Sequence, residues 1–426
     1  MLSATSAGRF KELTGLAAFF ITIPMEKAAY DALIVGAGPA GSTAAFLLAS
    51  YGLKVALLDR RDFPRPKLCG GLLTWKTIRL LETVFHITPR TLAENGVLRH
   101  AIREYRVSGR CRRGVRRTLD HPFHLVDREA YDHLLLQRAI SAGADFRPGK
   151  AVASVDLKRC EVATRNGEKW TGRFIIGADG VNSRVRRALL RARKIAEPRH
   201  PGLAAALECV VPRQPGAFPD HPSIYYGFIP WGYAWSFPAK GGQILGIAAL
   251  KSKAGRRIRA GFRDFLAHLD LEDTNPLPIR AHAIPYGNYL DTPGNANVLL
   301  AGDAAGVADP FLGEGIYYAH RSGQLAAQAL IESRSKPESA AGLYRDGLRR
   351  VIHPELRYAR AGRQIIFSLP SSLYYPVLTA LLRLMPKACE ETIQGQRTFR
   401  WFRKVKTLPG CPAHPSGMDP SNQRFL

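Results

Sequence analysis

The chain has 426 residues, of which 46% are hydrophobic and 23% are charged, and these values exclude a disordered or fibrous protein. Because this length exceeds the size at which one hydrophobic core stops growing, we expect two interleaved domains. The formal net charge of +26 favours anionic partners such as lipid or phosphate groups, although a solvated Arg-rich surface is an alternative explanation. Nucleic acid is not expected as a partner, because the sequence has no zinc spacing, RNA-stacking motif or dense basic arm.

The N-terminal segment, residues 1–28, is predicted to be an extension that precedes the folded protein. Its apolar run over residues 16–23 resembles a short secretory segment, but no cleavage signal follows it, and Met25 is an alternative start. No uninterrupted apolar stretch reaches the roughly 20 residues that a spanning helix needs. The cysteines are scattered without a C-x-x-C pair, which indicates a reducing cytoplasmic compartment and no metal site.

The first predicted elements are a strand over 30–35, a glycine-rich turn and a helix over 42–50. Gly36 permits the tight turn, Gly38 lets the backbone approach a pyrophosphate, and Gly41 lets the helix pack on the strand. The next strand, 54–59, ends in a carboxylate at the spacing of the residue that binds a ribose hydroxyl. These features predict a dinucleotide site with phosphate at the helix N-terminus. The predicted cofactor-binding residues in this unit are Gly36, Gly38, Pro39, Ala40, Gly41, Asp59 and Arg60.

Two later segments resemble signatures of the flavoprotein hydroxylase superfamily. Residues 174–180 form a strand and turn that contain Asp179, and residues 298–306 form a buried strand that ends at Gly302 and Asp303. The resemblance implies that FAD is the cofactor, that Asp303 binds its ribityl chain and that Arg128 lies against the flavin. A surface role is the alternative for Arg128. After the second segment, Gly313, Gly315 and Ile316 open a helix whose N-terminal dipole is suited to negative charge on reduced flavin.

Within that superfamily the chain resembles the geranylgeranyl reductase family. Residues 67–71, Lys-Leu-Cys-Gly-Gly, and residues 233–238, Tyr-Ala-Trp-Ser-Phe-Pro, match motifs of that family, and the resemblance covers roughly residues 30 to 335. It implies a substrate cavity lined by Tyr233, Trp235 and Phe237, which alternate on one face of a strand; plain core packing is the alternative. Gly70 and Gly71 would let backbone approach a planar ring. Cys69 is then a candidate catalytic proton donor or a small buried hydrophobe.

The expected fold class is α/β, with a Rossmann-type FAD-binding domain, an interleaved antiparallel-sheet substrate domain and a helical C-terminal segment. The FAD-binding domain is predicted to be discontinuous, so that the substrate sheet roofs the flavin. The predicted ranges are 29–98, 127–198 and 281–340 for the FAD-binding domain, 99–126 and 199–280 for the substrate domain, 341–408 for the helical region and 409–426 for a loose tail.

The predicted function is an FAD-dependent reductase that saturates C=C bonds of a geranylgeranyl-type chain on a lipid, quinone or related substrate. An FAD-dependent monooxygenase acting on an aromatic or lipid-like substrate is the main alternative, and a non-enzymatic redox-sensing flavoprotein is another. Because no second G-x-G-x-x-G occurs, the electron donor is expected to be transient NAD(P)H or an electron-transfer protein.

The apolar segment 365–385 bears on localisation. It is interrupted by Pro370 and Pro376 and flanked by basic residues, Arg363 among them. These features predict a segment that lies in the interface of an anionic membrane, peripheral on its cytoplasmic face. A helix that caps the substrate cavity is the alternative.

Overall fold

The computed structural model describes residues 29–110, 114–200, 202–212, 218–271 and 278–399. The predictions for the extension 1–28 with Met25, for residues 400–408 and for the tail 409–426 lie outside these residues.

One sheet carries the glycine-rich turn. Its strands run in the order β15-β16-β9-β1-β2-β6, all parallel except β15, and a hairpin of β7 and β8 extends from β9. Ala32 to Val35 of β1 are buried, as expected for a parallel strand covered on both faces. The strands are β1 (Tyr30–Val35), β2 (Val55–Leu58), β6 (Asp145–Arg147), β7 (Val152–Asp156), β8 (Glu161–Thr164), β9 (Lys169–Gly177), β15 (Gly294–Asn295) and β16 (Val298–Leu300).

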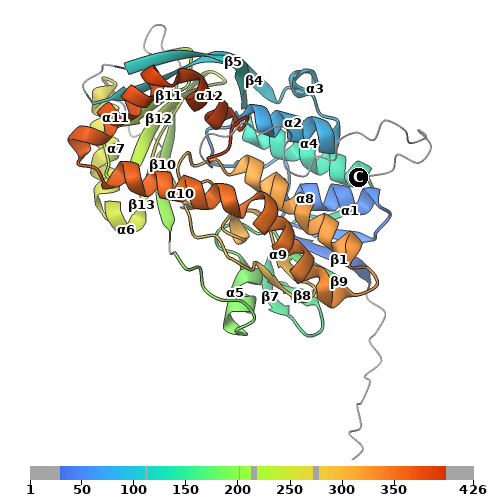
Figure 1. Ribbon diagram of the computed structural model, residues 1–426. Helices are drawn as coiled ribbons and strands as arrows, with labels where there is room; N and C mark the ends of the chain where they lie inside the picture. The colour runs from blue at the N-terminus through green and yellow to red at the C-terminus, as the bar shows by residue number, and fades with distance from the viewer. Residues whose placement is uncertain (1–28, 111–113, 201, 213–217, 272–277, 400–426) are drawn as a thin grey trace, which may run out of the picture.

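Helices α1, α4 and α8 pack together beside this sheet (Figure 1). His320 on α8 fixes them, because its ring nitrogens lie 2.7 Å from the hydroxyls of Thr43 on α1 and Tyr131 on α4. Burial lowers the pKa of His320 to about 3, so the ring is a neutral structural link. The helical elements up to α8 are α1 (Pro39–Ser50), α2 (Trp75–Phe85), α3 (Pro89–Glu94), α4 (Arg128–Ser141), α5 (Arg184–Arg191), α6 (Lys251–Ala254), α7 (Arg257–His268), the short η1 (Gly302–Ala304) and α8 (Ile316–Glu332).

The second sheet has the order β14-β10-β13-β12-β11-β4-β5-β3 and is antiparallel except where β11 meets β4. Helices α6 and α7 cover its outer face, where Leu245, Ile247, Phe262 and Phe265 are buried together (Figure 1). The strands are β3 (Leu72–Leu73), β4 (Leu98–Gly109), β5 (Gly114–Val126), β10 (Leu203–Pro212), β11 (Ser223–Tyr226), β12 (Gly232–Ala239), β13 (Gly242–Leu250) and β14 (Arg280–Pro285).

The C-terminal helices run from the first sheet to the second, in orange to red in Figure 1. The Tyr344 hydroxyl on α9 donates to the Leu300 carbonyl of β16, and the Gln394 side chain at the end of α12 bonds the backbones of Trp75 and His121. These contacts connect both sheets to the C-terminal helices. The remaining elements are η2 (Pro337–Ser339), α9 (Ala340–Val351), α10 (His353–Ser368), α11 (Ser371–Leu384) and α12 (Pro386–Gln394).

The expected α/β class, with a parallel cofactor sheet, an interleaved antiparallel-rich sheet and a helical C-terminal region, is confirmed. Two strands lie in the second sheet although their residues fall in ranges that we predicted for the cofactor domain: β3, within 29–98, and all of β14 after Arg280, within 281–340. No helix among the described residues is long and apolar enough to cross a membrane.

Candidate flavin site and substrate face

The turn between β1 and α1 accepts only glycine at two positions. Gly36 has φ +102°, and a Cβ there would lie 2.4 Å from the Ala178 carbonyl oxygen. A Cβ on Gly41 would lie 1.8 Å from the Gly36 carbonyl oxygen. Gly38 is the N-cap of α1 and Pro39 its first residue, so the amides of the first helical turn are available to an anion.

Asp59 lies beside this turn, at the end of β2. Its buried carboxylate accepts hydrogen bonds from the amides of Ala37 at 2.8 Å and Arg61 at 2.9 Å. Asp59 is therefore fixed where a ribose next to the pyrophosphate would lie. Arg60, which follows it, is exposed.

Arg65 is a cation at this turn that the sequence did not single out. Its Nη2 atom lies 3.7 Å from the position of a Cβ on Gly38, and it also lies 3.5 Å from the Asp132 carboxylate. This placement suits a contact with a pyrophosphate. Several basic residues occur between 60 and 67, and nothing in the sequence distinguishes Arg65 from them.

Arg128 is buried, which contradicts a surface role. It is the first residue of α4, and its guanidinium holds Asp132, one turn later, through contacts of 2.8 to 3.2 Å. Burial alone would lower the pKa of Arg128. The adjacent Asp132 and Cys69 side chains outweigh this effect and raise the pKa above its ordinary value, so the guanidinium stays charged. It is a fixed positive charge next to Cys69.

The Gly302–Asp303 turn, which ends β16, lies against α1. Gly302 has φ +60°, its amide donates to Ser322 Oγ at 2.8 Å, and a Cβ on it would lie 3.1 Å from the Cβ of Ala40. Burial raises the pKa of Asp303, whereas Lys67 and Arg128 lower it. Asp303 therefore joins the charged groups around Cys69.

Asp179 lies next to the first turn, at the end of β9. Its Cα is 3.0 Å from the position of a Cβ on Gly36, and one carboxylate oxygen accepts a 2.6 Å hydrogen bond from the Arg184 amide at the start of α5. The other oxygen is buried with no hydrogen-bond partner within the part of the chain that the structure describes. An unpartnered buried oxygen of this kind is suited to a ligand hydroxyl or amide.

The loop before α8 brings the cofactor residues to the second sheet. Gly313 has φ +74°, and a Cβ there would lie 2.6 Å from the hydroxyl of Tyr233. That hydroxyl donates to the Leu312 carbonyl at 2.6 Å. Gly315 is the N-cap of α8, Ile316 is its first residue, and no atom lies within 4 Å of a Cβ on Gly315. The helix N-terminus therefore has room for a ligand.

The aromatic residues of β12 share one face of the second sheet, opposite α7. The ring of Trp235 lies 6.2 Å from that of Tyr233 and 6.5 Å from that of Phe237. A Cβ on Gly70 would lie 2.5 Å from the Phe237 ring, so this face packs directly on the turn that contains Cys69. Gly71, with φ +69°, is held there by a 2.9 Å bond from the Val126 amide to its carbonyl. A cavity for an apolar chain along these rings stays a prediction.

Glu208, on β10, is a further residue at this junction that the sequence did not bring forward. Its side chain is buried, and its carboxylate lies near the backbone amide of Cys69. Close by, Lys67 Nζ lies 3.0 Å from His282 Nε2. The one feature of the sequence that could have pointed to Glu208 is that it is the single acidic residue within the apolar run 203–211.

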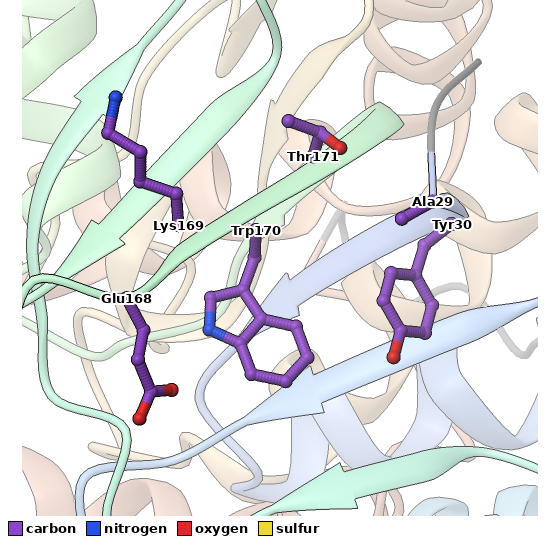
Figure 2. Close-up of a pocket in the computed structure, with 6 residues that line it drawn as sticks. All are labelled: Ala29, Tyr30, Glu168, Lys169, Trp170 and Thr171. Carbon is purple, nitrogen blue, oxygen red and sulfur yellow. The ribbon is translucent and has the colours of Figure 1, made fainter. Parts of the chain in front are cut away.

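A surface hollow of about 460 Å³ lies elsewhere. It is lined by Ala29, Tyr30, Glu168, Lys169, Trp170 and Thr171 (Figure 2). Tyr30 begins β1 and Trp170 lies near the start of β9, so the hollow is at the opposite edge of the parallel sheet from the glycine turn. Ligands of such sheets bind at the carboxyl ends of the strands, and we assign the hollow no role in the cofactor site.

The described residues fit a bound FAD. The turn at Gly38 has no side chain where a pyrophosphate must approach, and Arg65 supplies a cation there. Asp59 is placed for a ribose, Asp303 lies farther along the same edge, and Gly315 leaves the N-terminus of α8 open.

Comparison with known proteins agrees with this geometry. Residues 29–204 match the family model for an FAD binding domain. The chain is 34% identical over 319 residues to geranylgeranyl diphosphate reductase of Rhodobacter capsulatus, an alignment that covers 71% of this chain and 75% of that protein. The chain belongs to the geranylgeranyl reductase family. As a member of that family, it is an FAD-dependent oxidoreductase of isoprenoid lipid metabolism, as the sequence predicts.

Other members and solved structures extend the comparison. The chain is 28% identical to digeranylgeranylglycerophospholipid reductase 1 of Methanopyrus kandleri, over 73% of this chain and 83% of that protein. A geranylgeranyl bacteriochlorophyll reductase-like protein of Thermoplasma acidophilum shares the fold, with a TM-score of 0.72 and 21% identity over 86% of this chain and 99% of that one. A probable FAD-dependent monooxygenase from Pseudomonas aeruginosa also shares it, with a TM-score of 0.59 and 21% identity over 79% of this chain and 96% of that one.

Gly38→Asp should abolish FAD binding, because the carboxylate would lie beside Arg65, where the pyrophosphate belongs. The flavin-to-protein ratio of purified protein, read from its absorbance, measures this. Gly342→Asp is the matched control, since a Cβ at Gly342 on α9 has no atom within 4 Å, and it should retain its flavin. Stoichiometric FAD in a folded Gly38→Asp variant would contradict the placement.

Proposed function

We propose that this family member saturates C=C bonds of a geranylgeranyl-type chain carried by a lipid, quinone or related molecule. The observation that carries the proposal is the packing of the aromatic face of β12 on Gly70, next to Cys69 and the predicted flavin residues. The names of the relatives, geranylgeranyl diphosphate reductase and digeranylgeranylglycerophospholipid reductase, support this substrate class.

In this proposal each part of the site has a distinct task in cofactor binding. The first turn of α1 and Arg65 bind the pyrophosphate, Asp59 binds the adenosine ribose and Asp303 binds the ribityl chain. The Gly70–Gly71 backbone allows close approach to the planar ring. When bound and reduced, FAD supplies the hydride for one alkene carbon.

The remaining residues handle the substrate and the proton. Tyr233, Trp235 and Phe237 orient the chain and exclude water, and the Cys69 thiol holds the proton for the second alkene carbon. The fixed charge of Arg128 beside Cys69 stabilises the thiolate that remains after this transfer. The electron donor that reduces FAD is proposed to be transient NAD(P)H or an electron-transfer protein.

The reaction is tested with reduced enzyme under anaerobic conditions. A geranylgeranyl-bearing lipid should reoxidise the flavin, and its product should gain two hydrogens for each bond reduced, as seen by mass spectrometry. Trp235→Ala should lower kcat/KM by about 10- to 100-fold with normal flavin content, because the chain loses a large aromatic contact and the alkene is misplaced.

Trp170→Ala is the matched control for that substitution, because Trp170 lies in the hollow at the other edge of the sheet, and it should retain wild-type kcat/KM (Figure 2). The reductase proposal fails if every prenyl lipid leaves the reduced flavin untouched while admission of air leads to oxygen insertion into a substrate. That outcome would identify a monooxygenase.

We also propose peripheral binding to an anionic membrane through α10 and α11. The segment 365–385 is divided between the two helices. On its inner side, Tyr374 is buried beside Tyr226 of the second sheet. Large apolar side chains are exposed on these helices and just after them: Ile365 (69%), Leu373 (50%), Val377 (36%), Leu384 (81%) and Met385 (42%).

The charges near these helices divide into two groups. Arg363, which the sequence placed among the basic flanks, is buried and donates to the Tyr286 carbonyl at 2.7 Å, so it is not available to lipid. Arg383 is exposed near the apolar residues, and a basic residue close to an anionic surface contributes about 1 kcal/mol, whereas Lys387 pairs with Asp120 and lies 3.8 Å from Glu390. One side of the segment therefore packs on the second sheet, and apolar and basic side chains are exposed on its other side.

Vesicle flotation tests membrane binding. The wild-type protein should float with vesicles that contain an anionic phospholipid, and less of it should float as salt is raised. The double variant Ile365→Ser, Leu384→Ser should remain unbound, whereas Ile140→Ser, Leu343→Ser, which also changes two exposed apolar residues, should float like the wild type. Equal flotation of both double variants would rule out this surface.

A further inference from the structure

Glu208 lies in the same row of the second sheet as Trp235. Glu208 on β10 is paired with Gly246 on β13, and Gly246 is paired with Trp235 on β12. Side chains of directly paired residues project from the same face of a sheet, so Glu208 and Trp235 both project toward the cofactor side. Gly246 has no side chain, and the indole ring of Trp235 lies over it, 2.1 Å from the position of a Cβ. A carboxyl group therefore stands beside the aromatic face proposed to hold the substrate.

The Glu208 carboxylate is also close to the turn that carries the candidate proton donor. The carboxylate lies near the Cys69 amide, and the Cys69 side chain lies beside the Arg128 guanidinium. The Glu208 side chain is only 5% exposed, and Cys69 is half-buried. Both groups are thus held at the junction of the two sheets, largely away from bulk water.

Charged and titratable groups face Glu208 from each neighbouring element. Lys67 and Cys69 belong to the loop after β2, Arg128 to α4, and Arg280 to β14, with His282 on the same strand beside Lys67. Burial lowers the pKa of His282 to about 4, and burial also lowers the pKa of Lys67. Burial raises the pKa of Glu208 to about 7, against the opposing effects of the Cys69 amide and the cations Arg128, Arg280 and Lys67. A carboxyl group with this property can both hold and release a proton near neutral pH.

We propose that Glu208 is the proton store of the site and reprotonates Cys69 in each turnover, an inference that rests on the proposed function. As the alkene is reduced, the Cys69 S–H bond breaks and its proton forms a C–H bond at one alkene carbon, while the hydride from reduced FAD forms the other. The Glu208 O–H bond then breaks, the Cys69 S–H bond re-forms, and the carboxylate takes its next proton from water. Glu208 thus acts through Cys69.

The first experiment uses the protein without flavin and needs no turnover. In the unfolded chain a glutamate has a pKa near 4.5, so between about pH 4.5 and 7 the folded state binds more protons at Glu208 than the unfolded state does. The stability that this group contributes is therefore present at low pH and lost as pH rises through 7. Glu208→Gln keeps an oxygen near the Cys69 amide but cannot titrate.

The measured quantity is the difference in free energy of unfolding between wild type and Glu208→Gln, from urea titrations at pH 4.5 to 8.5. The wild type should lose stability relative to Glu208→Gln as pH rises from 4.5 to about 7, and the difference should be constant between about pH 7.5 and 8.5. A difference that is independent of pH would show that Glu208 does not exchange a proton there, and the proposal would fall.

The second experiment follows repeated reduction of a geranylgeranyl lipid by the flavin-loaded enzyme as a function of pH, under anaerobic conditions and with excess chemical reductant to re-reduce the flavin. The wild-type rate under repeated turnover should fall as pH rises through about 7, because the store is then empty. Glu208→Gln should be slower by about 100-fold or more and lack this pH dependence, with normal flavin content. Glu208→Asp restores a titratable carboxyl group and should restore a pH-dependent rate.

The outcomes separate the two proposals. If wild-type enzyme is not reoxidised by any prenyl lipid, the proposed function fails, while the unfolding experiment still reports on Glu208. If the wild type is reoxidised and Glu208→Gln matches it in rate and pH profile, Glu208 is not the proton store. A merely structural role would change flavin content or stability in all Glu208 variants without a distinct pH profile for Glu208→Asp.

Discussion

The packing of Gly70 and Gly71 directly on the second sheet is the constraint on which the rest of the site depends. Phe237 of the second sheet lies where a Gly70 side chain would be, and the Val126 carbonyl lies 2.2 Å from the position of a Gly71 Cβ. Any side chain at either position would push the loop after β2 away from the second sheet. This contact brings Cys69, the aromatic face of β12 and the cofactor residues to one place.

Buried charges at the same junction are held in pairs rather than left isolated. Asp132 is fully buried and contacts the guanidinium groups of Arg128 and Arg65, and Lys76 lies 2.5 Å from Glu314 near the start of α8. An unpaired charge at such positions would cost several kcal/mol, so each pair requires its partner element to stay in position. The first group thus fixes α4 to the loop after β2, and the second fixes α2 to the loop before α8. Glu208 differs, because its neighbours offset only part of the effect of burial, which raises the pKa of its carboxyl group to about 7.

The sequence predicted the features whose chemistry is local. The Gly36–Gly41 turn and the carboxylate of Asp59 form a short pattern, and backbone sterics demand glycine in it wherever it occurs. The family motifs similarly predicted the neighbourhood of Asp303 and the orientation of the β12 rings. Glu208 and Arg65 were not predicted, because their roles arise from contacts between distant segments: Glu208 meets Cys69 only when β10 packs on the turn after β2. Most of β14 was predicted to belong to the FAD-binding domain for the same kind of reason. Its pairing with the distant strand β10 places it in the second sheet, and that pairing cannot be read from the local sequence.

In the proposed reaction the alkene lies between the flavin and Cys69, against the aromatic face of β12. A crystal structure of the enzyme with FAD and a geranylgeranyl lipid measures this most directly. The flavin ring should lie on the Gly70–Gly71 backbone, with an alkene carbon near N5 and the chain along Tyr233, Trp235 and Phe237. A chain bound elsewhere, or a flavin ring away from the Gly70–Gly71 turn, would contradict the account.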